Sequence, residues 1–261
     1  MIGTCGFSYS DWKGVFYPEG INQSTMLPFY TTQFPAVELD YTYYQMPAAR
    51  TITAMDKKTP DNFCFSVKAH KSMTHEFTRK PDQDRPNFQN FITGIEPLLA
   101  TGKLGCILTQ FPWGFKYTLE NESYLDFVRD ELKDLPVVVE FRNVEWVKEE
   151  VFTKLEALNF GFCCVDEPKL KGLFPPLTRV TSEIGYLRFH GRNAAKWWKH
   201  SEGWERYDYK YASDELEEWV PNILKLKNET SKTFVLFNNH HAGQAVVNAR
   251  MLRDLLGDLI G

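Results

Sequence analysis

The chain has 261 residues, 43% of them hydrophobic. This size suits one large core, close to that of a barrel of about 250 residues, so we expect one domain over residues 1–261. The net charge of -4 argues against a protein coated in positive potential, such as a histone-like DNA binder. No run approaches the roughly 20 apolar residues that cross a bilayer, and the amino terminus lacks an export-signal pattern, so we expect a soluble cytoplasmic protein with no membrane partner.

In chain order, eight short apolar runs predict eight strands, beginning near residues 1, 36, 63, 104, 137, 161, 184 and 233. Most intervals between them hold one segment of helical periodicity, such as residues 119–133. We expect similar helices over residues 147–158, ended by Gly161, and at the end of the sequence, where apolar residues from Ala245 to Leu259 share one helical face. Alternating strands and helices imply parallel strands with right-handed crossovers. The sequence therefore predicts the α/β class and a single (β/α)8 TIM barrel.

Two segments depart from this alternation. Residues 167–183 contain Pro168, Pro175 and Pro176 and show no helical period, so we expect an irregular sixth crossover. Residues 190–212 form a long, aromatic-rich insertion after strand seven, followed by a helix with Ser213 as its N-cap residue. A loop of this length within a compact domain is usually functional or disordered, and its aromatic content argues against disorder.

Polar side chains end nearly every predicted strand. They are Glu38, Asp40, Lys68, Gln110, Glu140, Arg142, Asp166, Arg188, His190 and Asn238. The carboxyl ends of the strands of such a barrel meet at one mouth, so we expect these residues to lie together. Strand residues two apart face the same side, which couples Glu38 with Asp40, Glu140 with Arg142, and Arg188 with His190. Burying these charges against apolar helices is costly, so we expect them to point into the mouth.

The predicted mouth holds nearly balanced charges. Its acids are Glu38, Asp40, Glu140 and Asp166, and its bases are Lys68, Arg142 and Arg188. A two-metal hydrolase needs an excess of carboxylates and histidines, so we assign neither a metal nor another cofactor. A divalent ion is the less favoured alternative, for which His75, His190, His240 and His241 could add ligands.

The balanced charges have two interpretations. They could form a salt-bridge network that closes the top of the barrel. Alternatively, Lys68, Arg142, Arg188 and Arg192 hold a phosphate or carboxylate, while Glu38, Glu140, Asp166 or His190 orient them or transfer protons. Asn238 and Asn239 lead into the last helix, whose N-terminus could bind an anion or could simply be capped by either asparagine.

The insertion mixes cations with aromatic rings. Its cations include Arg192 and Arg206, and its rings are Trp197, Trp198, Trp204, Tyr207, Tyr209 and Tyr211. This mixture suits stacking on nucleic-acid bases beside phosphates, stacking on sugar rings, or a lid that packs its own rings on the barrel. The five cysteines form no CxxC pair, and we expect them to be reduced and buried.

The chain resembles the YecE-like family, known as domain of unknown function 72. The resemblance rests on blocks that run in order over almost the whole chain, including GTCGFSYSDWKGVFYP (3–18), FCFSVKAHKSMTH (63–75), VEFRNVEW (139–146), YLRFHGR (186–192) and VLFNNHHAGQA (235–245). It implies a TIM barrel and supplies no agreed reaction. It places Lys68, His75, Gln110, Arg142, Arg188 and Arg192 within the family's motifs.

The leading hypothesis is a barrel whose mouth binds a small anionic ligand, phosphate-bearing, and hydrolyses or isomerises it. In this hypothesis Lys68, His75, Gln110, Arg142, Arg188, Arg192, Trp197, Asn238 and Asn239 contact the ligand. A nucleic-acid binding protein that uses the insertion as a stacking platform is one alternative. A scaffold without chemistry, closed by salt bridges, is the other. The sequence leaves the oligomeric state open.

Overall fold

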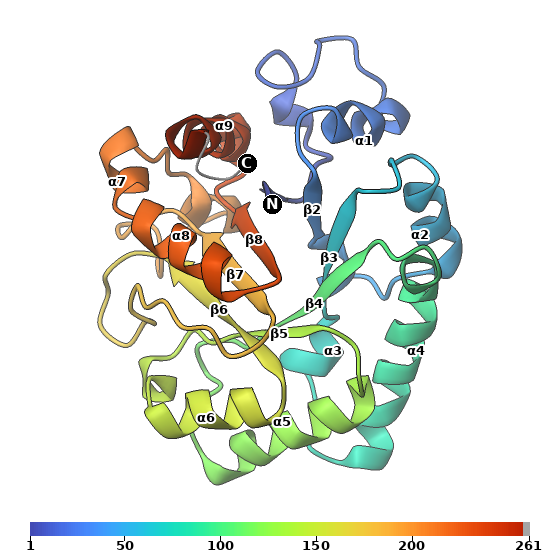
Figure 1. Cartoon of the computed structure of the whole chain (residues 1–261), viewed down its shortest axis with the longest axis vertical. Helices are drawn as coiled ribbons and strands as arrows, with labels where there is room; N and C mark the ends of the chain where they lie inside the picture. The colour runs from blue at the N-terminus through green and yellow to red at the C-terminus, as the bar shows by residue number, and fades with distance from the viewer. Residues whose placement is uncertain (258–261) are drawn as a thin grey trace.

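The computed structural model describes residues 1–257, and eight parallel strands within them close into a barrel (Figure 1). The strands follow one another in chain order around the barrel, and β1 pairs with both β2 and β8. Their bounds are β1 Ile2–Cys5, β2 Ala36–Leu39, β3 Cys64–Lys68, β4 Leu104–Gln110, β5 Val137–Glu140, β6 Phe160–Asp166, β7 Ile184–Phe189 and β8 Lys232–Phe237. The predicted (β/α)8 TIM barrel is confirmed.

Helices surround the strands on the outside of the barrel (Figure 1). Their bounds are α1 Gln23–Thr31, α2 Ala49–Asp56, α3 Lys71–Thr74, α4 Pro81–Ala100, α5 Leu119–Leu132, α6 Glu149–Ala157, α7 Ser213–Glu217, α8 Val220–Glu229 and α9 Gln244–Leu256. Because helices cover one face and inward side chains fill the other, the strands are buried on both faces, and all seven residues of β4 and of β6 are buried. Short 3-10 turns follow several strands: η1 Ser10–Trp12, η2 Tyr41–Tyr43, η3 Val144–Trp146, η4 Gly203–Tyr207 and η5 His241–Gly243.

The predicted helices form, with small differences at their ends. Gly161 does not end α6, because the helix stops at Ala157 and Gly161 lies inside β6. Asn159, with φ of +50°, turns the chain instead. Ser213 is the first residue of α7 rather than its N-cap, and the N–H of the preceding Ala212 donates to the Glu215 carboxylate. Leu259, expected to extend the last helical face, lies outside the described residues.

Both irregular segments are as predicted. Residues 167–183 contain no helix, and the insertion over residues 190–212 contains only the short turn η4. The insertion begins at Gly191, whose φ of +88° turns the chain sharply away from β7. Gly191 also donates its N–H to the Tyr211 hydroxyl at 2.8 Å, which joins the two ends of the insertion. The insertion is therefore an ordered loop held against the barrel.

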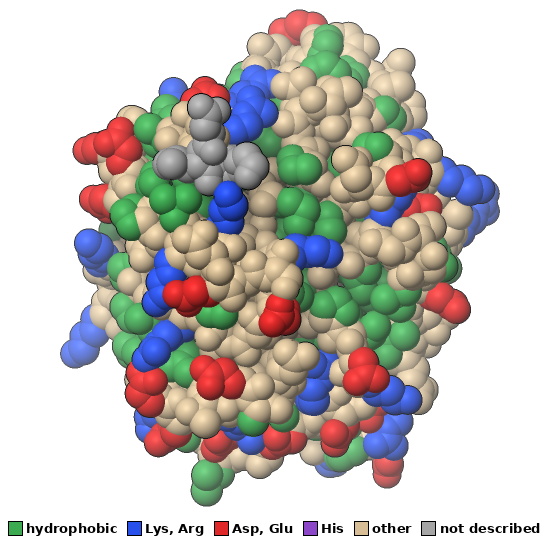
Figure 2. Space-filling model, in the orientation of Figure 1, with side chains coloured by type: hydrophobic (Ala, Val, Ile, Leu, Met, Phe, Trp, Pro, Cys, Tyr) green, Lys and Arg blue, Asp and Glu red, His purple; other side chains and the backbone are tan. Residues whose placement is uncertain are grey.

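The five cysteines are free and buried, as expected for small apolar side chains in a core. The face in Figure 2 intersperses acidic and basic side chains and shows no broad area of one sign. Within residues 1–257, no helix has the length and apolar character needed to span a bilayer.

Candidate functional site

A buried ion network lies at the centre of the barrel, around Arg188 on β7. Arg188 Nη2 donates to Glu38 Oε1 and Arg188 Nη1 donates to Glu140 Oε2, both at 2.7 Å. The Tyr186 hydroxyl donates to the second oxygen of Glu38 at 2.8 Å. Each of these four side chains is at most 1% exposed. Ends of β2, β5 and β7 thus meet as the strand pattern predicted, and the Arg188 cation is shared between two carboxylates.

Glu140 also contacts two further residues of the network, Arg142 and His190. Arg142 Nε lies 2.5 Å from Glu140 Oε1, and His190 Nε2 lies 3.1 Å from the same oxygen. The Asn238 amide nitrogen is 3.0 Å from His190 Nδ1, so the amide donates to Nδ1 and Nε2–H donates to Glu140. Burial lowers the pKa of His190 well below its usual value, and the Arg142 cation lowers it further. His190 is therefore neutral and fully enclosed.

The pKa of Glu140 reflects this crowding of donors. Burial alone raises the pKa, but Arg142, Arg188 and His190 outweigh burial and hold the pKa of Glu140 well below its usual value. Arg142 Nη1 also donates to Glu167 Oε2 at 2.9 Å. Burial raises the pKa of Glu167 to about 7, against the opposing effect of Arg142. Arg142 is consequently fixed between two carboxylates.

Asp166 and Arg192 do not join this network, contrary to the sequence prediction. Asp166 accepts from Tyr211 Oη at 2.6 Å, Trp219 Nε1 at 2.7 Å and Arg192 Nη2 at 2.8 Å. Arg192 further contacts Glu215 at 3.1 Å and Glu218 at 3.2 Å. The cause is strand alternation: Cys163 points toward Glu140, so Asp166, three residues on, faces the outer helices. These two residues anchor the insertion rather than line the mouth.

Above the network lies a cavity of about 240 Å³, here called the mouth pocket. It is lined by Tyr43, Tyr44, Lys68, His75, Gln110, Pro112, Trp113, Arg142, Leu173, Trp197, Trp198, Arg206 and Tyr207. Five of the predicted ligand-binding residues are among them: Lys68, His75, Gln110, Arg142 and Trp197. No described aspartate or glutamate lines it. The mouth pocket therefore concentrates positive charge and aromatic rings.

Two of its three cations have no carboxylate partner among residues 1–257. Lys68, at the end of β3, rests with Nζ 4.6 Å from the centre of the Tyr43 ring. Arg206, from η4, lies over Trp197 and contacts His200 at 3.1 Å, while its buried Nε has no hydrogen-bond partner. Partly buried cations without a carboxylate partner, and a buried donor without an acceptor, are costly, so an anion in the pocket would be stabilised by both residues.

Neutral polar groups complete the lining. The His75 ring meets the edge of Tyr43 at 4.8 Å between centroids, and Thr74 Oγ1 is 2.9 Å from its Nδ1. Burial and the Lys68 cation lower the pKa of His75 to about 4, so the ring is neutral at pH 7. Gln110 donates its amide to the Phe111 carbonyl at 2.7 Å. Both residues present polar atoms to the pocket without adding charge.

The rim of the mouth pocket is open and aromatic. Tyr44 is 75% exposed, Trp198 is 51% exposed and Trp113 is 41% exposed. Trp113 and Trp198 meet edge to face with ring centres 5.8 Å apart, which joins the loop after β4 to the insertion. Exposed rings at an opening offer stacking surfaces to a planar group.

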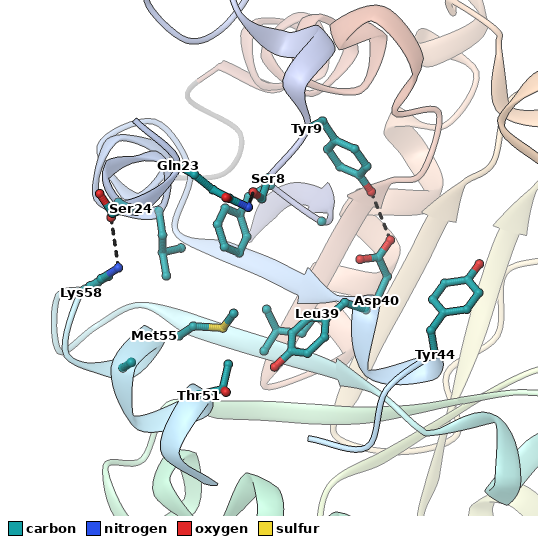
Figure 3. Close-up of a pocket in the computed structure, with 15 residues that line it drawn as sticks. Ser8, Tyr9, Gln23, Ser24, Leu39, Asp40, Tyr44, Thr51, Met55 and Lys58 are labelled. Atoms are coloured by element: carbon teal, nitrogen blue, oxygen red, sulfur yellow. Dashed lines mark hydrogen bonds between the residues drawn. The ribbon is translucent and has the colours of Figure 1, made fainter. Parts of the chain in front are cut away.

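A second, larger cavity of about 760 Å³ adjoins this rim through Tyr44 (Figure 3). Leu39 and Met55 supply part of its mostly apolar wall, and Tyr9 donates to Asp40 Oδ2 at 3.1 Å at one side. At the other side Lys58 donates to the Ser24 carbonyl at 3.1 Å. Asp40 therefore belongs to this apolar cavity, although the sequence placed it in the cluster with Glu38.

The asparagines after β8 serve the framework. Asn238 holds His190, and Asn239 Nδ2 donates to the Tyr209 carbonyl at 2.8 Å and to Asn248 at 2.9 Å. Neither caps α9, whose N-cap residue is Gly243 with φ of +74°. The Ala242 N–H just before α9 donates to the Asp11 carboxylate at 2.7 Å. The Asp11 carboxylate therefore holds the turn η5 that precedes α9.

Asn248, on α9, also holds the insertion. Its Oδ1 accepts from the Tyr211 N–H at 3.1 Å, and its Nδ2 donates to the Tyr211 carbonyl at 2.9 Å. Sequence reasoning did not single out Asn248, because a polar residue within an apolar helix face carries no signal of its partner.

Two residues of the candidate site were also not assigned from sequence. Arg206 was one of several insertion cations, and nothing in an irregular loop indicates which cation faces the barrel. Glu167 was passed over for Asp166, although strand alternation from Cys163 favours Glu167. In residues 1–257 the structure has no group of three or more His, Cys, Asp or Glu side chains placed to hold a metal ion.

Fold and site together define a TIM-barrel protein with a cationic, aromatic-walled pocket at the carboxyl ends of its strands. The profile of the family described as "Protein of unknown function DUF72" matches residues 1–259, and the chain belongs to this family. It is 35% identical to the UPF0759 protein YunF of Bacillus subtilis over 267 aligned positions, covering 98% of this chain and 94% of that protein.

Solved structures of the family share the fold. A DUF72 family protein from Thermotoga maritima is 40% identical, with a TM-score of 0.89 and 98% of each chain covered. One from Enterococcus faecalis is 29% identical, with a TM-score of 0.87, covering 98% of this chain and 94% of that one. The resemblance seen in the sequence is thus confirmed.

Proposed function

We propose that this protein binds a phosphate-bearing anion with a planar portion, such as a nucleotide, in the mouth pocket. The observation that carries the proposal is the lining itself, in which Lys68, Arg142 and Arg206 face six aromatic rings with no described carboxylate among them. Phosphate pairs with such cations by charge-assisted hydrogen bonds. Planar rings stack on aromatic side chains and on guanidinium groups.

The buried network has a supporting role in this proposal. Glu38, Glu140, Arg188 and His190 are fully enclosed and do not line the mouth pocket. The two carboxylates are ion-paired with Arg188, and Glu140 also with Arg142, which fits the salt-bridge interpretation for this layer. We assign them to holding Arg142 in position rather than to proton transfer with a ligand. The groups that line the pocket and can exchange protons are His75 and Lys68.

Titration with inorganic phosphate and with adenosine 5′-monophosphate, followed by tryptophan fluorescence, tests the proposal. Three tryptophans line the pocket, so occupancy should change the emission. Arg206→Met should weaken binding of either probe by roughly 10- to 100-fold, since a hydrogen bond to a charged group contributes about 1.5–3 kcal/mol. Lys57→Met, at an exposed lysine at the end of α2 that does not line the mouth pocket, is the matched control. Binding that is absent, or insensitive to Arg206→Met, would refute the proposal.

Single-stranded nucleic acid is the second candidate, because the exposed rings Tyr44, Trp113 and Trp198 extend the stacking surface beyond the cavity. A polymer would use these rings in addition to the pocket. A short oligothymidylate should then bind more tightly than the mononucleotide and lose affinity steeply with salt. If the oligonucleotide fails to displace adenosine 5′-monophosphate, this candidate is removed.

A further inference from the structure

Lys68, which is partly buried at the end of β3, differs from the buried Lys103 because no carboxylate among residues 1–257 lies within ion-pairing distance of it. Its Nζ makes no ion pair or hydrogen bond with residues 1–257 and rests on the Tyr43 ring. Lys103, by contrast, is 5% exposed, with Nζ 3.1 Å from Asp56 Oδ1 and hydrogen bonds to backbone carbonyls. Enclosed lysines normally need such partners. An unpartnered amine facing a cavity therefore points to a ligand.

The surroundings of Lys68 favour its uncharged form. Burial lowers the pKa of the Lys68 ammonium, and the nearby Arg188 cation lowers it further. Glu38, Tyr207 and Glu140 act in the opposite direction, and Asp40 also interacts electrostatically with Lys68. Glu38 and Glu140 are already ion-paired with Arg188. At neutral pH a larger fraction of Lys68 is free amine than for a lysine in water. The free amine is the nucleophilic form.

We infer that Lys68 is a nucleophile that forms an imine with the carbonyl carbon of an aldehyde or ketone whose anionic group is held by Arg206. This inference rests on the proposed function and names its ligand class as a carbonyl compound that carries phosphate. The mouth pocket, at about 240 Å³, is smaller than the roughly 300–1,000 Å³ of pockets for drug-sized ligands, which suits a compact molecule.

The step balances without any further reactant. The Nζ lone pair attacks the carbonyl carbon, a C–N bond forms, and the C=O π pair moves to oxygen, which takes a proton. The nitrogen gives up one proton to form the carbinolamine. The hydroxyl then takes a second proton and leaves as water, while the nitrogen lone pair forms the C=N bond and the nitrogen gives up its second proton, which leaves the imine. The neutral ring of His75, which meets the same Tyr43 ring as Lys68, lies in the pocket to carry these protons.

Reductive trapping tests the inference. Pyridoxal 5′-phosphate is a suitable probe, because it combines an aldehyde, a phosphate and a planar ring. The protein is incubated with increasing probe, reduced with borohydride, digested and mapped by mass spectrometry. Lys68 should be labelled at a lower probe concentration than Lys57, since a lowered pKa raises the fraction of free amine. Inorganic phosphate should protect Lys68, and pyridoxal without phosphate should label it less.

Two variants separate this inference from the proposed function. Lys68→Arg keeps the cation and should retain phosphate binding while losing the adduct. Arg206→Met should lose both phosphate protection and preferential labelling. Phosphate binding in the fluorescence titration without preferential labelling of Lys68 overturns the nucleophile and leaves the proposed function standing. Labelling of Lys68 that phosphate does not affect overturns the anion site, and absence of both binding and labelling overturns both.

Discussion

The buried network and the mouth pocket both contain cationic side chains, but these differ in whether a carboxylate neutralises them. In the network, Arg188 is 1% exposed and bridges Glu38 and Glu140, so its charge is neutralised within the protein. In the pocket, Lys68 and Arg206 have no carboxylate partner among the described residues. Pairing in the lower layer supports the barrel, whereas the unpaired cations above it leave charge available to a ligand. Ion pairing, rather than the presence of charge, therefore distinguishes the network from the pocket.

The largest effect is expected for Arg188→Met. The substitution leaves Glu38 and Glu140 buried with lost partners, which should lower the free energy of unfolding by about 3–5 kcal/mol in urea denaturation at pH 7. Arg85→Met is the control, because Arg85 is a half-exposed arginine paired with Glu131 and should change stability by at most about 1 kcal/mol. Equal losses in the two variants would remove the distinction between the layers.

A smaller loss is expected for Asp166→Asn, which disturbs the other paired cluster. The Asp166 carboxylate accepts from Tyr211, Trp219 and Arg192, and an amide cannot satisfy all three donors. We expect a loss of about 2–3 kcal/mol in thermal or urea unfolding, with phosphate affinity unchanged. Asp130→Asn, at an exposed position, should be nearly neutral. A loss of phosphate affinity larger than the loss of stability would place Asp166 back in the site.

Glu167→Gln sharpens the comparison through pH. Because its pKa is about 7 in the folded protein, above the unfolded value near 4.3, the folded state retains the proton as pH rises between these values. Wild-type stability from this group is therefore present at low pH and lost toward pH 7. The stability of Glu167→Gln minus that of wild type should rise by about 1–3 kcal/mol from pH 4.5 to 7. A flat difference curve would contradict the raised pKa.

The smallest effect on stability is expected for Arg206→Met. Without a carboxylate partner to lose, the variant should unfold within about 0.5 kcal/mol of wild type, or be slightly more stable. Circular dichroism in urea checks this value beside the phosphate titration. A destabilisation comparable with that of Arg188→Met would show that Arg206 supports the loop instead of remaining available to a ligand.

Sequence patterns predicted the central network because strand geometry fixes it. Each strand end was recognisable by its polar residue, and closure of the barrel brings Glu38, Glu140, Arg142 and Arg188 together whatever the loops do. The same reasoning misplaced Asp166. We expected this last residue of β6 to face the mouth, but the carboxylate that faces inward there belongs to the next residue, Glu167. Strand alternation supplied the missing information, since β6 side chains that share a face with Cys163 point inward.

The pocket above the network was less predictable. Lys68, His75 and Gln110 follow strands and could be assigned, but Arg206 lies in an insertion without periodicity. Its position depends on contacts with Trp197 and Tyr207 that no spacing rule encodes. Arg192 was misassigned for the same reason, because its carboxylate partners Glu215 and Glu218 come from the following helical region.

The contact between Asn248 and Tyr211 links the outside of the barrel to its opening. One amide on α9 closes two backbone hydrogen bonds with the loop that roofs the pocket, although α9 contributes no lining residue. α9 therefore stabilises the insertion from outside the pocket. Truncating the chain before α9 would loosen the insertion while leaving every residue that lines the pocket in the sequence.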